Sequence, residues 1–339
     1  MDRVVAVAPP KPTPVPVQQD LNTVLRHTPT VAWRVKLAGP IIHNLAVSDG
    51  VIFAVANGVV HAVGPDGKVL WTAEVDASGP VNATRLGPVV GTNQGVVAVF
   101  DVQRGILEEK YHGAGRVRGA PVLVGGVPAW TTSEGLVVGA GGWFIEAALS
   151  AAGGPASDGF RLVFSSLEGD VVAVEPSGVQ WKSHLPGPGL GTPVISESIV
   201  IASFGARRGR KGGVAAFDLA TGEPRWDLTV DFEPAATPLV DEYLWLATRD
   251  GEVSAIDLES GEKVWSIHLS TEMTSSPVVT AHTVFVSGAD GTVRRLDRDD
   301  GGEVWSIELG SPVSGDPVLL DDALIVGLTN GELVCLRGN

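Results

Sequence analysis

Short runs of alternating apolar and polar residues fill most of the chain after residue 30, and Gly, Asp, Asn or Pro residues separate them. Four such runs follow one another between residues 237 and 269: "TPLVDE", "YLWLATR", "GEVSAID" and "EKVWSIHL". Alternation with a period of two is typical of β-strands with one buried face, and the residues between the runs favour tight turns. Long helical patterns are absent, so the sequence predicts an all-β protein built from short strands.

The pattern repeats with a period of about 40 residues. Two markers reveal the repeat, a tryptophan late in a unit and a proline at its start. The tryptophans are Trp33, Trp71, Trp181, Trp226, Trp265 and Trp305, and the prolines are Pro40, Pro80, Pro121, Pro155, Pro193, Pro238, Pro277 and Pro317. Four antiparallel strands in each unit, here named a to d in chain order, predict an eight-bladed β-propeller.

The two ends of the chain are expected to close the ring. The last unit has only three strands, at 316–320, 323–328 and 331–337, whereas "VAWRVKL" at 31–37 looks like a strand d and carries Trp33. We therefore expect residues 31–37 to complete the eighth blade, which removes an open sheet edge. Seven blades plus an irregular N-terminal segment is the alternative, and it leaves Pro40 and Trp33 unexplained.

The domain organisation follows from this closure. Residues 1–30 are rich in proline and are predicted to be an extended tether, and residues 31–339 a single propeller domain. The third unit, near 118–149, lacks the usual acid, glycine and tryptophan, and the fourth begins with the weak strand "AAGGPASDGF". The ring should be least regular there. Trp143 either replaces the missing tryptophan or lies on the surface.

The stretch "FDLATGEPRW" at 217–226 raises the question of a repeated binding site, because it returns as "IDLESGEKVW" and "LDRDDGGEVW". A carboxylate that accepts turn N–H groups, a glycine with positive φ and a tryptophan that packs between blades explain all three copies. We interpret the motif as architecture.

Composition limits the possible functions. The net charge is −15 with a pI near 4.8, which argues against a nucleic-acid partner, and no apolar run is long enough to span a membrane. The first residues do not form a signal peptide, so either the protein is cytoplasmic or a leader has been removed and Met1 added. Cys335 is the only cysteine and is expected to be a small buried residue.

Residue patterns for catalysis, cofactor binding or metal binding are not found. The seven histidines lack metal-ligand spacing, "DRDDGGE" at 297–303 does not match a calcium loop, and no Gly-x-Ser-x-Gly elbow occurs. The enzymatic alternative is an active quinone dehydrogenase, a family in which two adjacent cysteines cover the cofactor, whereas Cys335 is the only cysteine in this sequence. We therefore expect no enzyme activity, no cofactor and no metal.

Charge predicts a difference between the two sides of the ring. The a–b and c–d turns share one side, the turn face, and the b–c and d–a connections share the other, the loop face. The turn face should carry acidic residues at Asp49, Asp66, Glu197, Asp218, Glu223, Asp241, Glu242, Asp257, Glu259, Asp297, Asp299, Asp300, Asp321 and Asp322. The basic clusters fall on the loop face, at Arg116, Arg118, Arg207, Arg208, Arg210 and Lys211. Four of them lie within five positions, 207–211, and this loop is either a solvated, mobile insertion or a patch that binds an acidic segment of a partner.

The aligned motifs resemble the tryptophan-docking repeat of quinoprotein-type propellers. Within that group, "HTPTVAW" at 27–33, "GTPVISESIVIASF" with "GGVAAFDLATGEPRW", and the C-terminal "GDPVLLDDALIVGLTNGELVCLRGN" are similar to the BamB family of outer-membrane lipoproteins. "VRGAP" at 117–121 is similar to the loop with which that family contacts its barrel-forming partner. It lacks the leucines of that loop and comes one blade early, and the lipid-bearing cysteine of the family is absent.

The resemblance implies a non-catalytic scaffold that binds a protein of the outer-membrane β-barrel assembly machinery, with Arg118 in the contact. If a leader and a lipidated cysteine have been removed, the resemblance implies that the protein lies at the periplasmic face of the outer membrane and has a lipid anchor upstream. Otherwise the expected location is the cytoplasm. A propeller sensor or ligand-binding module of a larger signalling system is the alternative.

Overall fold

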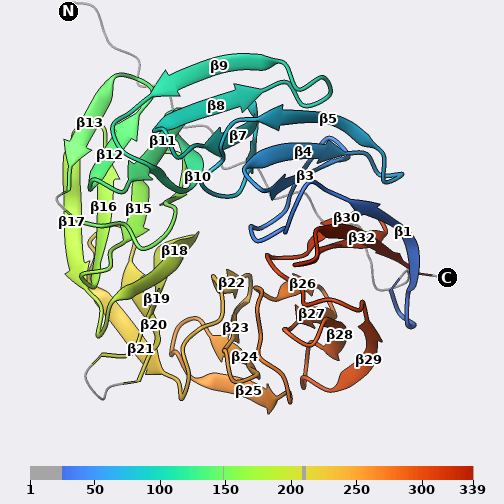
Figure 1. Cartoon of the computed structure of the whole chain (residues 1–339). Helices are drawn as coiled ribbons and strands as arrows, with labels where there is room; N and C mark the ends of the chain where they lie inside the picture. Colours follow the sequence, from blue (N-terminus) through green and yellow to red (C-terminus); the bar gives the residue numbers. More distant parts are fainter. Residues whose placement is uncertain (1–24, 148, 208–210, 339) are drawn as a thin grey trace, which may run out of the picture.

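The chain forms a closed ring of β-sheets in the computed structural model, which describes residues 25–147, 149–207 and 211–338. Within these ranges the chain folds into strands β1 to β32 and no helix. The strands make eight four-stranded antiparallel sheets that stand around a central axis like the blades of a propeller (Figure 1). The predicted eight-bladed β-propeller is therefore confirmed.

Blades 1 to 4 form the first half of the ring. Blade 1 contains β2 (Ala46–Ser48), β3 (Val51–Ala56), β4 (Val59–Val63) and β5 (Val69–Glu74). Blade 2 contains β6 (Asn82–Thr84), β7 (Gly87–Gly91), β8 (Val96–Phe100) and β9 (Leu107–His112). Blade 3 contains β10 (Val117–Val124), β11 (Val127–Thr132), β12 (Leu136–Gly139) and β13 (Trp143–Glu146). Blade 4 contains β14 (Ala156–Ser157), β15 (Leu162–Ser165), β16 (Asp170–Glu175) and β17 (Gly178–His184).

Blades 5 to 8 form the second half of the ring. Blade 5 contains β18 (Gly189–Ser196), β19 (Ile199–Phe204), β20 (Gly213–Asp218) and β21 (Pro224–Thr229). Blade 6 contains β22 (Leu239–Val240), β23 (Tyr243–Ala247), β24 (Glu252–Asp257) and β25 (Lys263–His268). Blade 7 contains β26 (Val278–Thr280), β27 (Thr283–Ser287), β28 (Thr292–Asp297) and β29 (Glu303–Glu308). Blade 8 contains β30 (Val318–Leu320), β31 (Ala323–Gly327), β32 (Glu332–Arg337) and β1 (Thr30–Lys36).

The position of a strand in its blade sets its burial. Strands b and c lie between neighbouring blades, so both of their faces take apolar residues. β3, with sequence VIFAVA, is buried at every position. Strands d form the outer rim of the ring (Figure 1), and their side chains are alternately packed inward and exposed. In β25, for example, Trp265 and Ile267 pack inward and their neighbours are exposed. This alternation is the pattern that the sequence displays.

Tryptophans of the d strands connect one blade to the next. Their indole N–H groups donate to carbonyls in the c–d turn of the following blade at 2.8–3.0 Å, in the pairs Trp33–Pro65, Trp71–Val102, Trp181–Leu219, Trp226–Leu258 and Trp265–Arg298. A glycine of positive φ in each turn lies against the ring: Gly67, Gly105, Gly222, Gly261 and Gly301. A Cβ on any of them would come within 2.4–2.8 Å of the indole. The repeated motif is thus a contact between blades.

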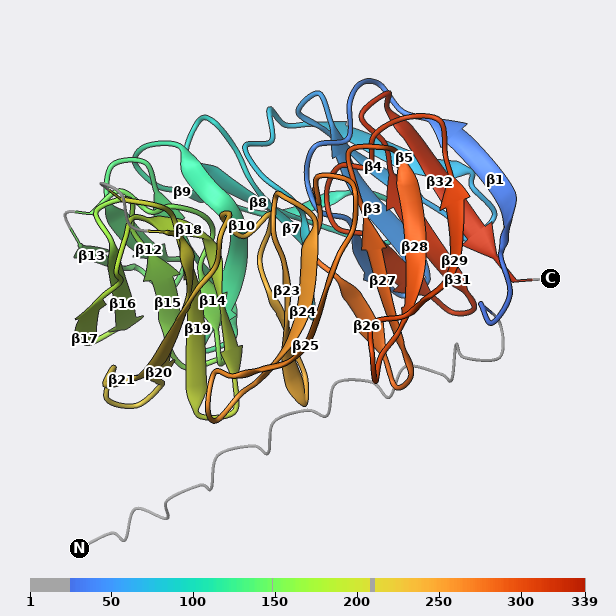
Figure 2. The same ribbon diagram turned by 90° about the horizontal axis from the view of Figure 1, so that it is seen from below.

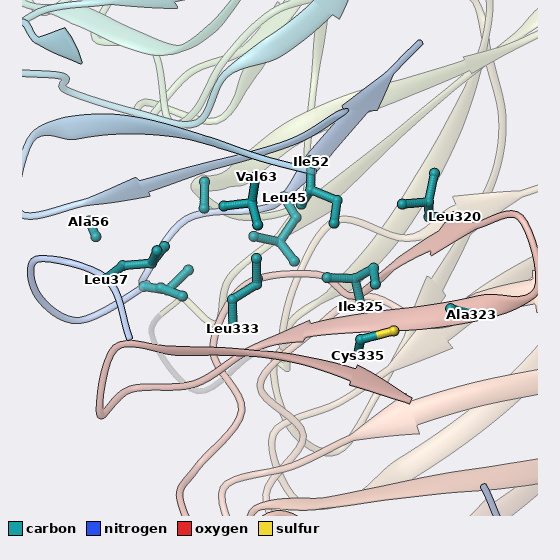
Figure 3. Close-up of a cluster of buried hydrophobic side chains, with 12 residues drawn as sticks. Leu37, Leu45, Ile52, Ala56, Val63, Leu320, Ala323, Ile325, Leu333 and Cys335 are labelled. Atoms are coloured by element: carbon teal, nitrogen blue, oxygen red, sulfur yellow. The ribbon is translucent and has the colours of Figure 1, made fainter. Parts of the chain in front are cut away.

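Blade 8 closes the ring with both ends of the chain. β1 pairs antiparallel with β32, with Trp33 opposite Cys335, and the two strands lie side by side in both views (Figures 1 and 2). Leu37 and Ile52 pack with Ile325, Leu333 and Cys335 in a buried cluster between blades 8 and 1 (Figure 3). The predicted closure by residues 31–37 is confirmed. Burial raises the pKa of the Cys335 thiol.

The segment just before β1 replaces the c–d turn that blade 8 lacks. Because blade 8 takes its strand d from the other end of the chain, no c–d turn lies beside Trp305. The Trp305 indole donates instead to the carbonyl of Leu25 at 2.9 Å, and the Leu25 side chain is buried between blades 7 and 8. The predicted tether, residues 1–30, falls mostly outside the described residues, and its last part packs on the ring.

The third and fourth blades show how the ring tolerates departures from the repeat. Trp143 pairs with Gly139 in the same register in which Trp305 pairs with Arg295, so it occupies the position of the other tryptophans. Its indole lies across Gly139, where a Cβ would be 2.0 Å from the ring, and packs on apolar residues of blades 3 and 4. Within the described residues its N–H has no hydrogen-bond partner. The weak first strand of blade 4 is two residues long, but so is β22 in blade 6.

Candidate functional site

The loop face carries the cations that the sequence singles out, in two separate blades. Arg116 and Arg118 lie at the start of blade 3, and Arg207 and Lys211 lie in the b–c connection of blade 5. Arg208 and Arg210 lie outside the described residues. Blade 4 separates the two groups in the ring, so the described members are two clusters on one face.

Arg116 lies on the loop face, in the d–a connection that enters blade 3. Its side chain is exposed and its Nη2 donates to the carbonyl of Ser78 at 3.2 Å. Burial, together with the charge of Arg116, lowers the pKa of His43, which lies in the connection that enters blade 1. Arg116 is thus tied to the connection between blades 1 and 2, and its charge favours the neutral form of His43.

Arg118 lies deeper, in β10 opposite Thr131. The residue is half-buried, and its Nε is one of the buried nitrogen atoms without a hydrogen-bond partner in the described part of the chain. A guanidinium N–H that is removed from water without a partner is costly. No carboxylate forms an ion pair with Arg118 in the described part of the chain, so its charge is not neutralised there.

The cations of blade 5 are partly compensated. Lys211 forms an ion pair with Asp231 of the following d–a connection, and this contact lowers the pKa of the Asp231 carboxyl. Arg207 is exposed. Phe232, beside Asp231, is 56% exposed, and Ile42 at the channel mouth is 63% exposed. The loop face therefore offers arginines and isolated apolar side chains together, the combination that protein interfaces favour.

The central channel contains two adjoining cavities of about 640 and about 320 Å³. Ile42, Asn44, Thr237 and Asp316 line both of them. Arg249, an exposed cation in the b–c turn of blade 6, lines the smaller cavity and was not singled out from the sequence. Arg249 therefore adds a positive charge to the lining of the channel.

A hydrogen-bonded group of side chains lines one half of the channel. The Asp316 carboxylate accepts from Ser276 N at 2.6 Å, from Ser276 Oγ at 2.8 Å and from Asn44 Nδ2 at 2.6 Å. Burial raises the pKa of Asp316 in spite of the Ser276 donors. Glycines of blades 2 to 5 line the opposite half, where backbones of adjacent blades meet; a Cβ on Gly79 would be 2.9 Å from the Gly119 carbonyl.

Sequence reasoning missed this group because each member looks like an ordinary loop residue. The available signal was position: Thr237, Ser276 and Asp316 each directly precede the repeat proline. Among the described residues, no cluster of His, Cys, Asp and Glu is arranged to hold a metal ion. None of the described residues forms a helix able to span a bilayer.

The turn face is acidic as expected, and many of its carboxylates have a structural task. Asp218 Oδ1 accepts from the N–H groups of Ala220 and Thr221 at 3.0 Å, and Asp257 does the same in blade 6. Arg298 forms ion pairs with Asp241 and Glu242 across blades 7 and 6. The loop face also bears carboxylates, such as Asp231, so the two faces differ less than the sequence suggests.

Comparison with known proteins extends these observations. A protein-family model described as outer membrane protein assembly factor BamB matches residues 19–151, 125–227 and 210–339, which together span almost the whole chain. Among curated proteins, the sequence has no significant match.

Three solved structures share the fold. BamB from Moraxella catarrhalis is 18% identical, with a TM-score of 0.72 over 91% of this chain and 98% of that one. The computationally designed protein Ika8 is 16% identical, with a TM-score of 0.75 over 91% and 99% of the two chains. Sqt1 from Saccharomyces cerevisiae is 12% identical, with a TM-score of 0.77 over 92% and 100%. All three identities are below 20%, so this likeness shows a shared fold and does not by itself show a shared function.

Proposed function

The chain belongs to the family of outer membrane protein assembly factor BamB, and from that membership we propose that it is a non-catalytic scaffold that binds a protein partner during the assembly of outer-membrane β-barrel proteins. The observation that carries the proposal is the family match along almost the whole chain. The proposal includes the periplasmic face of the outer membrane as the place of action and a lipid anchor upstream of the propeller.

The proposed contact surface is the loop face around the channel mouth, with Arg116, Arg118, Arg207, Arg208, Arg210 and Lys211. The exposure of Arg116 and Arg207 and the unpaired Nε of Arg118 support it. Lys211 contributes less, because Asp231 already neutralises it. The closed ring holds the loops in fixed positions, so binding orders few groups, and guanidinium groups pair well with carboxylates of a partner.

The test is capture of a named partner class. Tagged wild-type protein and the double variant Arg116→Glu with Arg118→Glu are incubated with a detergent extract of outer membranes. The captured proteins are identified by mass spectrometry. We expect the wild type to enrich a β-barrel assembly component and the double variant to lose at least about 90% of it, since reversal of paired charges typically costs 2 kcal/mol or more.

Arg104→Glu is the matched control. Arg104 is an exposed arginine in the c–d turn of blade 2, so the variant makes the same charge change on the opposite face. Capture that survives the double variant and is lost with Arg104→Glu would place the contact on the turn face and contradict the proposal.

The channel cavity favours a second candidate function, a propeller that senses a small polar ligand. The Asn44–Ser276–Asp316 group and a volume of about 640 Å³ support it. Native mass spectrometry of the purified protein tests this candidate, and a co-purifying small molecule that is lost in Asp316→Asn is the result that would favour it over the scaffold.

A further inference from the structure

An open groove lies between blades 1 and 2, away from the channel. Its volume is about 800 Å³. Ala98 and Phe100 of β8 and Leu107 of β9 form an apolar floor, and Val75 of blade 1 faces them. The groove extends from the loop face, at Asn57 and Gln94, toward the outer rim of blade 2.

Two small side chains explain why a groove exists here. The second residue after the d-strand tryptophan packs toward the next blade, and it is Leu228, Ile267 and Ile307 in blades 5 to 7 but Ala73 in blade 1. By the strand registers, the facing position in strand c is Arg294 in blade 7 and Val334 in blade 8, but it is alanine in blade 2 (Ala98) and in blade 5 (Ala215). Between blades 1 and 2 alanine meets alanine, and the space stays unfilled. Between blades 4 and 5 Ala215 meets Ser183, but the Ser183 hydroxyl donates to the carbonyl of Gly222 in the next blade.

The rims of the groove carry charges that the protein itself does not pair. Glu74 and Asp76 are exposed on the blade 1 side, and neither forms an ion pair among the described residues. Asn93 Nδ2 donates to Asp76 Oδ1 at 2.8 Å, which orients the carboxylate but leaves its charge. Lys110 lies on the blade 2 side, also without an ion pair there. A bound segment thus meets an acidic rim, a basic rim and an apolar floor.

We propose that this groove binds an extended peptide segment of a partner protein, with one large apolar side chain on the Ala98–Phe100–Leu107 floor and a Lys or Arg beside it against Glu74 and Asp76. The strand c residues that line the groove run from Val96 to Phe100, a length of about 13 Å at 3.3 Å per residue, which an extended segment of about five residues would span. Alternate side chains of such a segment point to the same side, which places an apolar residue and a cation two positions later in the groove together.

Fluorescence anisotropy with labelled peptides tests the proposal. The probe is Gly-Thr-Phe-Thr-Lys-Thr-Gly, and the comparison peptides replace Phe by Ala or Lys by Glu. We expect saturable binding of the probe by the wild type and at least about tenfold weaker binding of both comparison peptides. Ala98→Leu fills the floor and should weaken probe binding at least about tenfold, and Leu107→Ser should do so several-fold. Glu74→Gln should abolish the preference for Lys over Glu.

Matched controls exist elsewhere in the ring. Val179 occupies the strand position of Leu107 in blade 4 and is also 48% exposed, and Glu308 occupies the position of Glu74 in blade 7. Val179→Ser and Glu308→Gln should bind the probe as the wild type does.

The proposal would be overturned if the wild type showed no saturable binding of the probe up to about 1 mM, a Kd that corresponds to a binding free energy of about −4 kcal/mol. It would also be overturned if Leu107→Ser bound the probe as tightly as the wild type does, since this exposed substitution does not require the core to repack. The same holds if the groove bound decyl maltoside but none of the peptides. Loss of capture in the arginine variants is a separate result and does not bear on this groove.

Discussion

At the scale of single residues, the glycine of the c–d turn matters as much as the tryptophan it faces. Gly261 has a φ of 73° and its missing Cβ leaves the space in which the Trp226 ring lies. No binding function is needed to explain why the motif is repeated, because the positive φ and the contact with the indole each disfavour any residue other than glycine at this position. The sequence allowed this interpretation, since the offsets of the acid, the glycine and the tryptophan are constant.

Gly261→Ala should therefore be more costly than an ordinary glycine substitution. The positive φ costs about 1 kcal/mol, and a Cβ placed 2.7 Å from Trp226 Cδ2 must displace the ring. We expect a loss of unfolding free energy of about 2–4 kcal/mol, measured by urea denaturation followed by tryptophan fluorescence. Gly310→Ala is the control, because Gly310 has a φ of 85° and no atom within 4 Å of its Cβ position. Equal losses in the two variants would show that the ring contact adds nothing.

Other residues could not be interpreted from the sequence alone. Trp143 occupies the register position of the other tryptophans, but only the structure shows that its ring lies on Gly139 and that its N–H bonds to none of the described turns. Likewise, four cations in five positions suggested a basic patch, whereas Lys211 is paired with Asp231. Side-chain partners that come from another connection leave no trace in the local pattern.

At the scale of elements, the c–d turn is held by its carboxylate. Arg225 and then the N–H groups of Thr221 and Ala220 lower the pKa of Asp218 to about 2 from a usual value of 3.8. Strand positions followed from the short apolar or alternating runs and from the turn residues between them, because burial between blades makes strands b and c apolar and the exposed rim makes strands d alternate. The groove between blades 1 and 2 could not be predicted from the sequence, because it depends on which residues of two different blades meet.

The pH dependence of the Asp218 turn can be worked out from this shift. A carboxyl whose pKa is lower in the folded state stabilises the fold above its unfolded pKa, and this contribution disappears as the pH falls toward the folded pKa. Asp218→Asn should therefore lower the melting temperature by a constant amount at pH 6–8, and the difference should shrink between about pH 4 and about pH 2. Differential scanning calorimetry across this range checks the prediction. The difference should also decrease in high salt, since the side chain is exposed to solvent. A difference independent of pH would show that the charge of Asp218 has no part in the turn.

At the scale of the whole molecule, the ring depends on a substitute for one turn. Seven blades are continuous in the chain, and blade 8 joins β1 to β30, β31 and β32. Leu25 supplies the carbonyl that a c–d turn supplies elsewhere, and its side chain fills the space between blades 7 and 8. The sequence predicted the borrowed strand from the missing strand d, but it gave no sign that the residues ahead of that strand replace the turn.

A circular permutant tests this account of closure. Leu336 and Val31 pair in blade 8 as Phe217 and Pro224 pair in blade 5, so the six residues Asp-Leu-Ala-Thr-Gly-Glu of 218–223 fit between Leu336 and Val31. New termini are opened between Ser270 and Thr271, in an exposed d–a connection of the kind that tolerates them. Residues 1–30 and 337–339 are left out.

We expect this permutant to melt within a few degrees of the full chain, because the grafted turn offers Trp305 a leucine carbonyl in the place of Leu25. The native-order chain without residues 1–29 should melt well below both, since it lacks the buried Leu25 side chain, whose loss alone costs about 2–5 kcal/mol. Hydrogen exchange of the Trp305 indole N–H by NMR distinguishes the two, with protection in the permutant and in the full chain only. Replacement of the grafted Gly by Ala should lower the melting temperature again, as Gly261→Ala does. If instead the permutant unfolds as easily as the truncated chain, then the segment around Leu25 stabilises the ring through contacts that a c–d turn cannot replace.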